Sequence, residues 1–309
     1  MEFSVLMNKM VIFIVLMLIG YLLARRGMFS PDFTRSASQL VLNVFMVGTI
    51  LSSMVTTGAE RDLSDISETI VVTFAMTLIG YLVSVLITRF VRVEEENAAS
   101  YEILMGVGNS MFIALPIAEA LYGPYAVFIC SVSCIPFNLF LYTYGVWRLK
   151  GSGKSEGLRL KDMFSVPLIT TLAGLLIVLL HIHVPQALRG VFSALSGATM
   201  PMSMMVIGAS LGSVSLLEAF RNPKMAILSA VRLILIPIVT WFVCRFLTDD
   251  SILLMTGMII AAAPSAVIIT VLAIQYDHDP VFTSEAVQHS TICSMVTIPL
   301  LIQILSKFS

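Results

Sequence analysis

The feature that most constrains this chain is a series of long apolar runs without any charged residue. Six runs lack Asp, Glu, Lys and Arg altogether, and they cover residues 36–59, 69–88, 120–147, 163–188, 190–217 and 251–276. Each reaches the roughly 20 residues that a helix needs to cross the hydrocarbon core of a bilayer. Four further stretches, at 5–24, 101–123, 225–247 and 281–305, are nearly free of charge. Together they predict an all-α integral membrane protein with ten transmembrane helices.

Composition and motifs argue against an enzyme or a soluble domain. Only 12% of the 309 residues are charged, against about 25% in soluble domains. The first stretch ends at Arg25 and Arg26 without a cleavage site, so we interpret it as a transmembrane helix and not as a signal peptide. The four cysteines lie inside predicted helices, where they more often pack than ligate metal. The chain has four histidines and neither an H-E-x-x-H nor a G-x-S-x-G motif, and we expect no cofactor, metal site or nucleic-acid partner.

The basic residues predict the orientation. When ten helices are assigned to alternating sides, Arg25, Arg26, Arg35, Arg89, Arg92, Arg148, Lys150, Lys154, Arg159, Lys161, Arg221 and Lys224 fall on one side, and Lys9, Arg61, Arg189, Arg245 and Lys307 on the other. The positive-inside rule makes the first side cytoplasmic. We therefore expect a multi-pass protein of the plasma membrane with both termini outside and a cytoplasmic linker at 149–162.

The segments on either side of this linker resemble one another. Five matches occur in the same order, at offsets between 148 and 163 residues: Gly20 with Gly174, "VGTIL" (47–51) with "IGASL" (207–211), Arg89 with Arg245, Pro116 with Pro264, and "SVSCIP" (131–136) with "SMVTIP" (294–299). They predict a five-helix repeat at 1–148 and a second at 163–309. Because five is odd, the second copy would be inverted in the membrane. Inverted repeats with matching Gly/Pro-interrupted helices point to a secondary transporter with its site near the bilayer midplane.

The matching prolines predict that the fourth and ninth helices are broken. Pro116 has no N–H and its ring clashes with the preceding turn, so we expect the fourth helix to break just before it. "AAAPSAV" predicts the same at Pro264. The N–H groups that follow, beginning at Ile117 and Ser265, would present two positive helix ends to an anion. The alternative is that each proline merely kinks its helix.

Several polar residues in the apolar runs are candidate ligands. Asn109 and Ser110 lie between Gly106 and Pro116, and their side chains can hydrogen-bond a carboxylate; alternatively, they join neighbouring helices. Asn43 and Asn138 are further candidates of the same kind.

Charged residues inside predicted helices suggest further roles. Arg232 follows Pro223 by nine residues, which at a rise of 1.5 Å places it about 13 Å into the membrane. It would neutralise a substrate anion, pair with Glu119, or bind the carbonyls of discontinuous helix ends. Glu119 would stabilise a helix N-terminus or carry a proton, and Glu285 and His289 are the other candidate proton carriers.

The same segments resemble a known family. "GVGNSMFIALPIAEALYG" (106–123), "ATMPMSMMVIGASL" (198–211), "RLILIP" (232–237) and "AAAPSAVIITVLAIQYDHD" (261–279) are similar to the auxin efflux carrier family, which includes plant exporters of the PIN type and bacterial organic-acid permeases. The family pattern in the fourth helix is roughly G-N-[ST]-G-F-x-G-x-P. This chain keeps Gly108, Asn109, Ser110, Phe112 and Pro116, with Met111 and Ala114 where glycines are usual.

The resemblance implies a fold and a mechanism. The first, second, sixth and seventh helices would form a scaffold, often dimeric, and the other six a transport domain whose broken fourth and ninth helices cross at the prolines. Family substrates are carboxylate anions such as auxin, malate or malonate, and the short linker is typical of the bacterial permeases. We therefore predict a homodimeric secondary transporter for a small organic anion, working by an elevator-type mechanism in the bilayer. An anion channel or uniporter and a ligand sensor are the alternatives, and coupling to a proton or to sodium stays open.

Overall fold

The computed structural model describes residues 3–58, 61–91, 93, 95–150, 163–212 and 220–308. These residues are helical apart from their connections, and they contain no β-strand beyond one isolated bridge. The chain divides into two compact units. Unit 1 comprises Met1–Ile70, Met111–Cys134 and Ser165–Ser215, and unit 2 comprises Val71–Ser110, Ile135–Phe164 and Leu216–Ser309. From residue 151 onward, the linker predicted at 149–162 lies outside the described residues.

Unit 1 consists of helices from both halves of the sequence. Its elements are α1 (Phe3–Arg25), α2 (Pro31–Leu40), the π-helical turn η1 (Val41–Phe45), α3 (Met46–Thr56), α6 (Leu115–Tyr122), α10 (Val166–Leu179) and α11 (Gln186–Gly212). Three elements cross the division between the units along the chain, namely α4 (Leu63–Phe90), the π-helical turn η3 (Ser110–Ala114) and α7 (Pro124–Phe140).

Unit 2 holds the remaining elements. They are α5 (Glu95–Gly106), the π-helical turn η4 (Leu141–Gly145), α8 (Val146–Lys150), α13 (Pro223–Ala230), the π-helical turn η6 (Val231–Leu235), α14 (Ile236–Cys244), α15 (Ser251–Ala262), α16 (Ile268–Gln275) and α17 (Pro280–Leu305).

Seven helices among the described residues are long and apolar enough to cross a membrane. They cover Met7–Arg25, Pro31–Thr56, Leu63–Phe90, Pro124–Lys150, Gln186–Gly212, Pro223–Cys244 and Pro280–Leu305. Three shorter apolar helices, Ser110–Tyr122, Val166–Leu179 and Ser251–Ala262, fall in the other predicted spans. The chain is thus a multi-pass membrane protein, whereas the ten spans and their inverted repeat stay predictions.

Local sequence signals explain where many helices begin. An N-cap side chain accepts a hydrogen bond from a free N–H of the first turn at Ser30, Ser165, Asn222, Asp250 and Asp279. Four of these caps are followed by a proline in the first turn, where its missing N–H leaves no intrahelical bond unmade. Such caps matter in a membrane protein because unsatisfied backbone groups at helix ends are costly near lipid.

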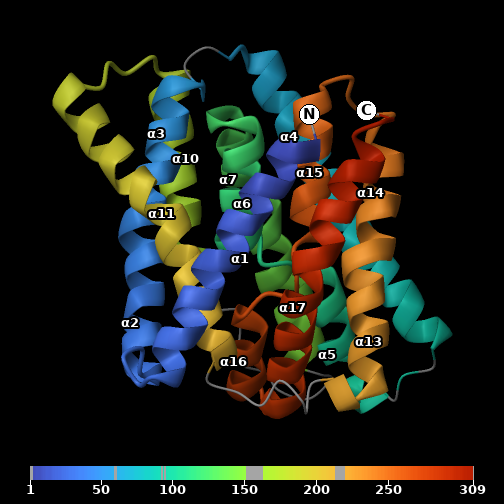
Figure 1. The fold of residues 1–309 in the computed structure, drawn as a ribbon. Helices are drawn as coiled ribbons and strands as arrows, with labels where there is room; N and C mark the ends of the chain where they lie inside the picture. Colours follow the sequence, from blue (N-terminus) through green and yellow to red (C-terminus); the bar gives the residue numbers. More distant parts are fainter. Residues whose placement is uncertain are drawn as a thin grey trace. The chain divides into compact units, whose positions relative to one another are not determined.

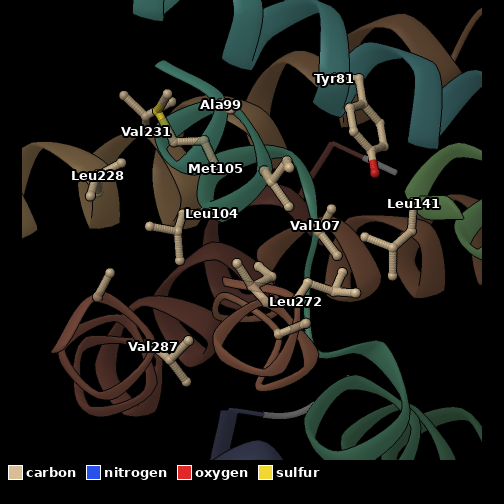
Figure 2. Packing of buried hydrophobic residues seen from close by; sticks show 14 of the residues in the cluster. Tyr81, Ala99, Leu104, Met105, Val107, Leu141, Leu228, Val231, Leu272 and Val287 are labelled. Carbon is tan, nitrogen blue, oxygen red and sulfur yellow. The ribbon is translucent and has the colours of Figure 1, made fainter. Parts of the chain in front are cut away.

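A buried apolar cluster holds unit 2 together. Leu104, Met105 and Val107, at the end of α5, point into it together with Leu272 of α16 and Val287 of α17 (Figure 2). Because α5 and α16 belong to opposite halves of the sequence, this cluster fixes the position of two helix ends that are far apart along the chain.

Glycines let α1 and α11 touch backbone to backbone in unit 1 (Figure 1). A Cβ on Gly208 of α11 would collide with the carbonyl of Met17 in α1, and a Cβ on Gly20 of α1 with the carbonyl of Met205 in α11. Small residues at such crossings are how membrane helices approach closely without a hydrophobic driving force between them.

We predict that Gly208→Ala destabilises the protein by about 1–3 kcal/mol, because the added methyl group pushes two backbones apart. The matched control is Gly197→Ala on the same helix, where a Cβ meets nothing within 4 Å. It should be neutral or stabilising by up to about 1 kcal/mol, since alanine favours helix. Thermal unfolding of the purified protein in detergent measures both, and equal melting temperatures for the two variants would contradict the packing.

Candidate functional site

The fourth predicted helix is interrupted at Val107–Asn109. α5 ends at Gly106, the next three residues leave the helix, and helical structure resumes in η3 and continues directly into α6. Pro116 therefore lies inside a continuous helical stretch, in the first turn of α6. The prediction of a break just before Pro116 is wrong. The helix is instead interrupted several residues earlier, at Val107–Asn109.

The π-helical turns explain how the helix passes its proline. η3 ends two residues before Pro116, and η6 likewise ends two residues before Pro237 of α14. A π-helical turn is wider than an α-helical one, so it relieves the clash between a proline ring and the preceding turn. The proline thus shapes the preceding turn instead of ending the helix.

The chain is also non-helical around Pro264. α15 ends at Ala262, Ala263 is extended with φ −61° and ψ 142°, and α16 begins at Ile268. Pro264 lies in the middle of the non-helical segment.

The two interruptions meet in unit 2 as an isolated antiparallel bridge between Gly108 and Ser265. The Asn109 N–H donates to the Pro264 carbonyl over 2.7 Å, and the Ala266 N–H donates to the Val107 carbonyl over 3.1 Å. The Ser265 N–H donates to Ser290 Oγ of α17 over 3.1 Å. Two of the N–H groups that were predicted to face an anion after Pro264 are therefore bonded within the protein.

Arg232 binds the carbonyl ends of both interrupted helices. Its Nε lies 2.8 Å from the Ala263 carbonyl oxygen, its Nη1 3.1 Å from that of Met105 and its Nη2 3.4 Å from that of Ile260. Only 3% of Arg232 is exposed. Of the three roles that the sequence left open, these bonds match the one at discontinuous helix ends.

Ser265 and Gly108 complete this arrangement. Ser265 Oγ donates to the Leu104 carbonyl over 2.7 Å, which satisfies one more carbonyl at the end of α5. A Cβ on Gly108 would collide with Arg232 Nη2 and lie 2.8 Å from Cζ of the same guanidinium. Gly108 therefore makes room for the arginine, a role that the sequence analysis did not assign to it.

The other predicted ligands lie in different surroundings. Asn109, Ser110 and Asn138 are buried in unit 2, whereas Asn43 is exposed in η1 of unit 1. Pro116 and Ile117 are buried in unit 1. The structure thus brings Asn109, Ser110, Pro264, Ser265 and Arg232 together around one pair of interruptions.

The candidate proton carriers make contacts of their own. In unit 1, Ser196 Oγ of α11 donates to Glu119 Oε1 over 3.2 Å. In unit 2, His289 Nδ1 of α17 lies 2.7 Å from Ser229 Oγ of α13, and its ring lies 4.5 Å from that of Phe220. Glu285, one turn earlier on α17, is partly buried. The role of each of these residues as a proton carrier stays a prediction.

One buried ionic cluster was missed by the sequence reasoning. Arg148 of α8 donates to both carboxylate oxygens of Glu102 in α5, over 2.8 and 2.9 Å, and the Tyr144 hydroxyl donates to the same carboxylate over 2.8 Å. Glu102 is 2% exposed. Nearby, His278 Nε2 donates to the Leu149 carbonyl over 2.8 Å. The sequence signal was Glu102 itself, one of two carboxylates in the nearly charge-free stretch 101–123.

Irregular backbone that is satisfied by protein inside a multi-helix membrane fold is typical of membrane transporters. A model of the family described as "Membrane transport protein" matches residues 5–159 and 155–302. An uncharacterized transporter of Methanothermobacter thermautotrophicus is 25% identical over 293 residues, which are 93% of this chain and 94% of that protein. An uncharacterized transporter of Methanocaldococcus jannaschii is 24% identical over 303 residues, or 95% and 97% of the two chains.

These matches cover nearly the whole sequence. The chain belongs to the family of membrane transport proteins that includes the auxin efflux carriers, as its motifs predicted.

We predict that Ser265→Ala destabilises the protein by about 1–3 kcal/mol, because it leaves the buried Leu104 carbonyl without a donor. The matched control is Ser294→Ala, which removes another buried serine whose hydroxyl bonds a carbonyl of its own helix, that of Thr291. This control should lose much less stability. Unfolding of both variants in detergent, followed by circular dichroism, makes the comparison. A Ser265→Ala protein as stable as the control would show that the bond is dispensable.

Proposed function

We propose that this protein is a secondary carrier for a small organic anion, an auxin-like acid or a mono- or dicarboxylate. The observation that supports it most is the antiparallel pairing of two interrupted helices, with Asn109 and Ser110 directly beside the bridge. Discontinuous helices of this kind form the substrate site in many secondary transporters. A soluble or purely structural role would not call for polar, non-helical backbone inside an apolar fold.

The proposed ligands are the side chains at this pairing. The amide of Asn109 and the hydroxyl of Ser110 would donate to the carboxylate, with Asn138 of the same unit as a further contact. The N–H groups of Ser265 and Ala266 are bonded in this conformation, so they contribute less than the sequence implied. Arg232 supports an anionic substrate in a different way: its permanent charge produces a positive potential near the site without contacting the ligand.

The division of the chain supports an elevator-type mechanism. Unit 1 contains α1, α2–α3, α10 and α11, which are the first, second, sixth and seventh predicted helices, whereas both interruptions belong to unit 2. In the proposed cycle, unit 1 is the scaffold of a homodimer and unit 2 carries the anion. Residues Met111–Cys134 group with unit 1, so the hinges would lie near Ile70, at Ser110 and near Cys134, within the third, fourth and fifth predicted helices.

Counterflow into proteoliposomes tests the function and the site together. We expect saturable uptake of at least one labelled carboxylate, and we expect Asn109→Ala to lower it at least about tenfold, the cost of one lost polar contact to a charged ligand. The control is Asn8→Ala, at an exposed position of α1, which should leave uptake unchanged. Full uptake by Asn109→Ala would overturn the site assignment.

The same preparation separates the alternatives. Ligand binding without uptake would identify a sensor, and unsaturable single-channel currents would identify a channel. Saturable counterflow with neither of these outcomes supports a carrier.

The proposed orientation has its own test. In a Cys293→Ser background, a membrane-impermeant maleimide should label Phe308→Cys from outside intact cells and Ser155→Cys only after the cells are opened. The basis is the excess of Lys and Arg on the linker side. The reverse labelling pattern would place both termini in the cytoplasm.

A further inference from the structure

The carbonyl groups at the ends of α5 and α15 are chemically suited to bind a metal cation. The C-terminal end of a helix carries partial negative charge. In secondary transporters, unwound carbonyls and the C-terminal ends of half-helices are where a coupling sodium ion binds. In this chain, such carbonyls belong to Leu104 and Met105 of α5 and to Ile260 and Ala263 at the end of α15.

Each of these four carbonyl oxygens already accepts a hydrogen bond from a protein side chain. The guanidinium of Arg232 donates to Met105, Ile260 and Ala263 over 2.8 to 3.4 Å, and Ser265 Oγ donates to Leu104 over 2.7 Å. A sodium ion would need several of the same oxygens at once, so it would have to displace the arginine. The displaced guanidinium would then be a second buried cation beside the first.

The surroundings are built for a guanidinium. Gly108 lacks the Cβ that would collide with Nη2, and the π-helical turn η6 carries Arg232 between α13 and α14. The planar guanidinium has five N–H donors in fixed directions, which allows one side chain to serve carbonyls of two different helices. A lysine would provide a single point charge on a flexible stem and could not bridge them in this way.

We infer that Arg232 is a resident cation that takes the place of a coupling sodium ion at the paired helix ends. It follows that the carrier moves its anion without sodium, an inference that rests on the proposed function. A tethered charge travels with unit 2 in both directions, so it neutralises the helix ends throughout the cycle but transfers no energy from an ion gradient. The driving force is then the membrane potential acting on the anion, at about 2.3 kcal/mol per charge per 100 mV, or a proton.

The first measurement needs no substrate. Purified wild-type protein is melted in sodium chloride, potassium chloride and choline chloride at equal ionic strength. We expect the same Tm in all three salts, because a ligand raises Tm only when it binds the folded state. A sodium-specific rise in Tm that saturates with concentration would overturn the inference.

The second measurement uses flux. Initial rates of carboxylate counterflow are compared in sodium and choline media with the membrane potential clamped, and we expect a ratio close to one. A rate that falls at least about tenfold in choline would overturn the inference, since a coupled carrier stops without its ion. Absence of flux in every medium would refute the proposed function instead, and the melting measurement would still decide the role of sodium.

A matched pair of variants tests Arg232 itself. We expect Arg232→Ala to lose at least about tenfold in flux and to melt at a lower temperature, because carbonyls without donors are costly inside a membrane. The control is Arg245→Ala, which removes an exposed arginine that stacks on Trp241 at the end of the same predicted helix and should leave flux unchanged. Full flux and stability of Arg232→Ala would overturn the inference. If this variant does not fold, the two wild-type measurements decide.

Discussion

The constraint on which the functional part of this protein depends is the satisfaction of backbone carbonyls where two membrane helices stop. A helix end in hydrocarbon has no water to bond its last carbonyls. In unit 2, these carbonyls accept hydrogen bonds from one arginine and one serine, and a backbone bridge pairs the two interrupted segments. Gly108 gives the arginine its space, and the buried cluster around Val107 and Leu272 holds the two ends in register (Figure 2).

The bonding of these carbonyls by Arg232 also bears on which ligand the paired helix ends would bind. In the proposed carrier, the permanent cation bonded to these carbonyls compensates the negative helix ends and would favour an anion over a metal cation. In the proposed site, the neutral side chains of Asn109 and Ser110 beside the bridge would bind a carboxylate without adding another buried charge. The Glu102–Arg148 pair joins α5 to α8, and His278, between α16 and α17, bonds the carbonyl of Leu149 in α8.

Two errors of the sequence reasoning have the same physical origin. The break was expected at Pro116 because proline interrupts an α-helix, but the π-helical turn η3 absorbs the proline and the opening falls at the glycines before it. The sequence analysis did not identify the role of Glu102 because its partner Arg148 lies 46 residues away. Arg148 was instead counted among the basic residues near the linker. Both outcomes depend on local backbone register and on long-range pairing, which a pattern of residue types does not record.

The sequence by itself determined the membrane class, the family and the presence of two polar, interrupted segments, because charge-free runs, their flanking arginines and the glycine–proline motifs are properties of the linear chain. It also singled out Arg232 as a costly buried charge that needs an explanation. Only the tertiary structure decided which carbonyls Arg232 bonds and where the fourth predicted helix is interrupted. Those answers require residues more than 100 positions apart to meet within 3 Å or so, and hydrogen-bond geometry at that range is set by the packed fold.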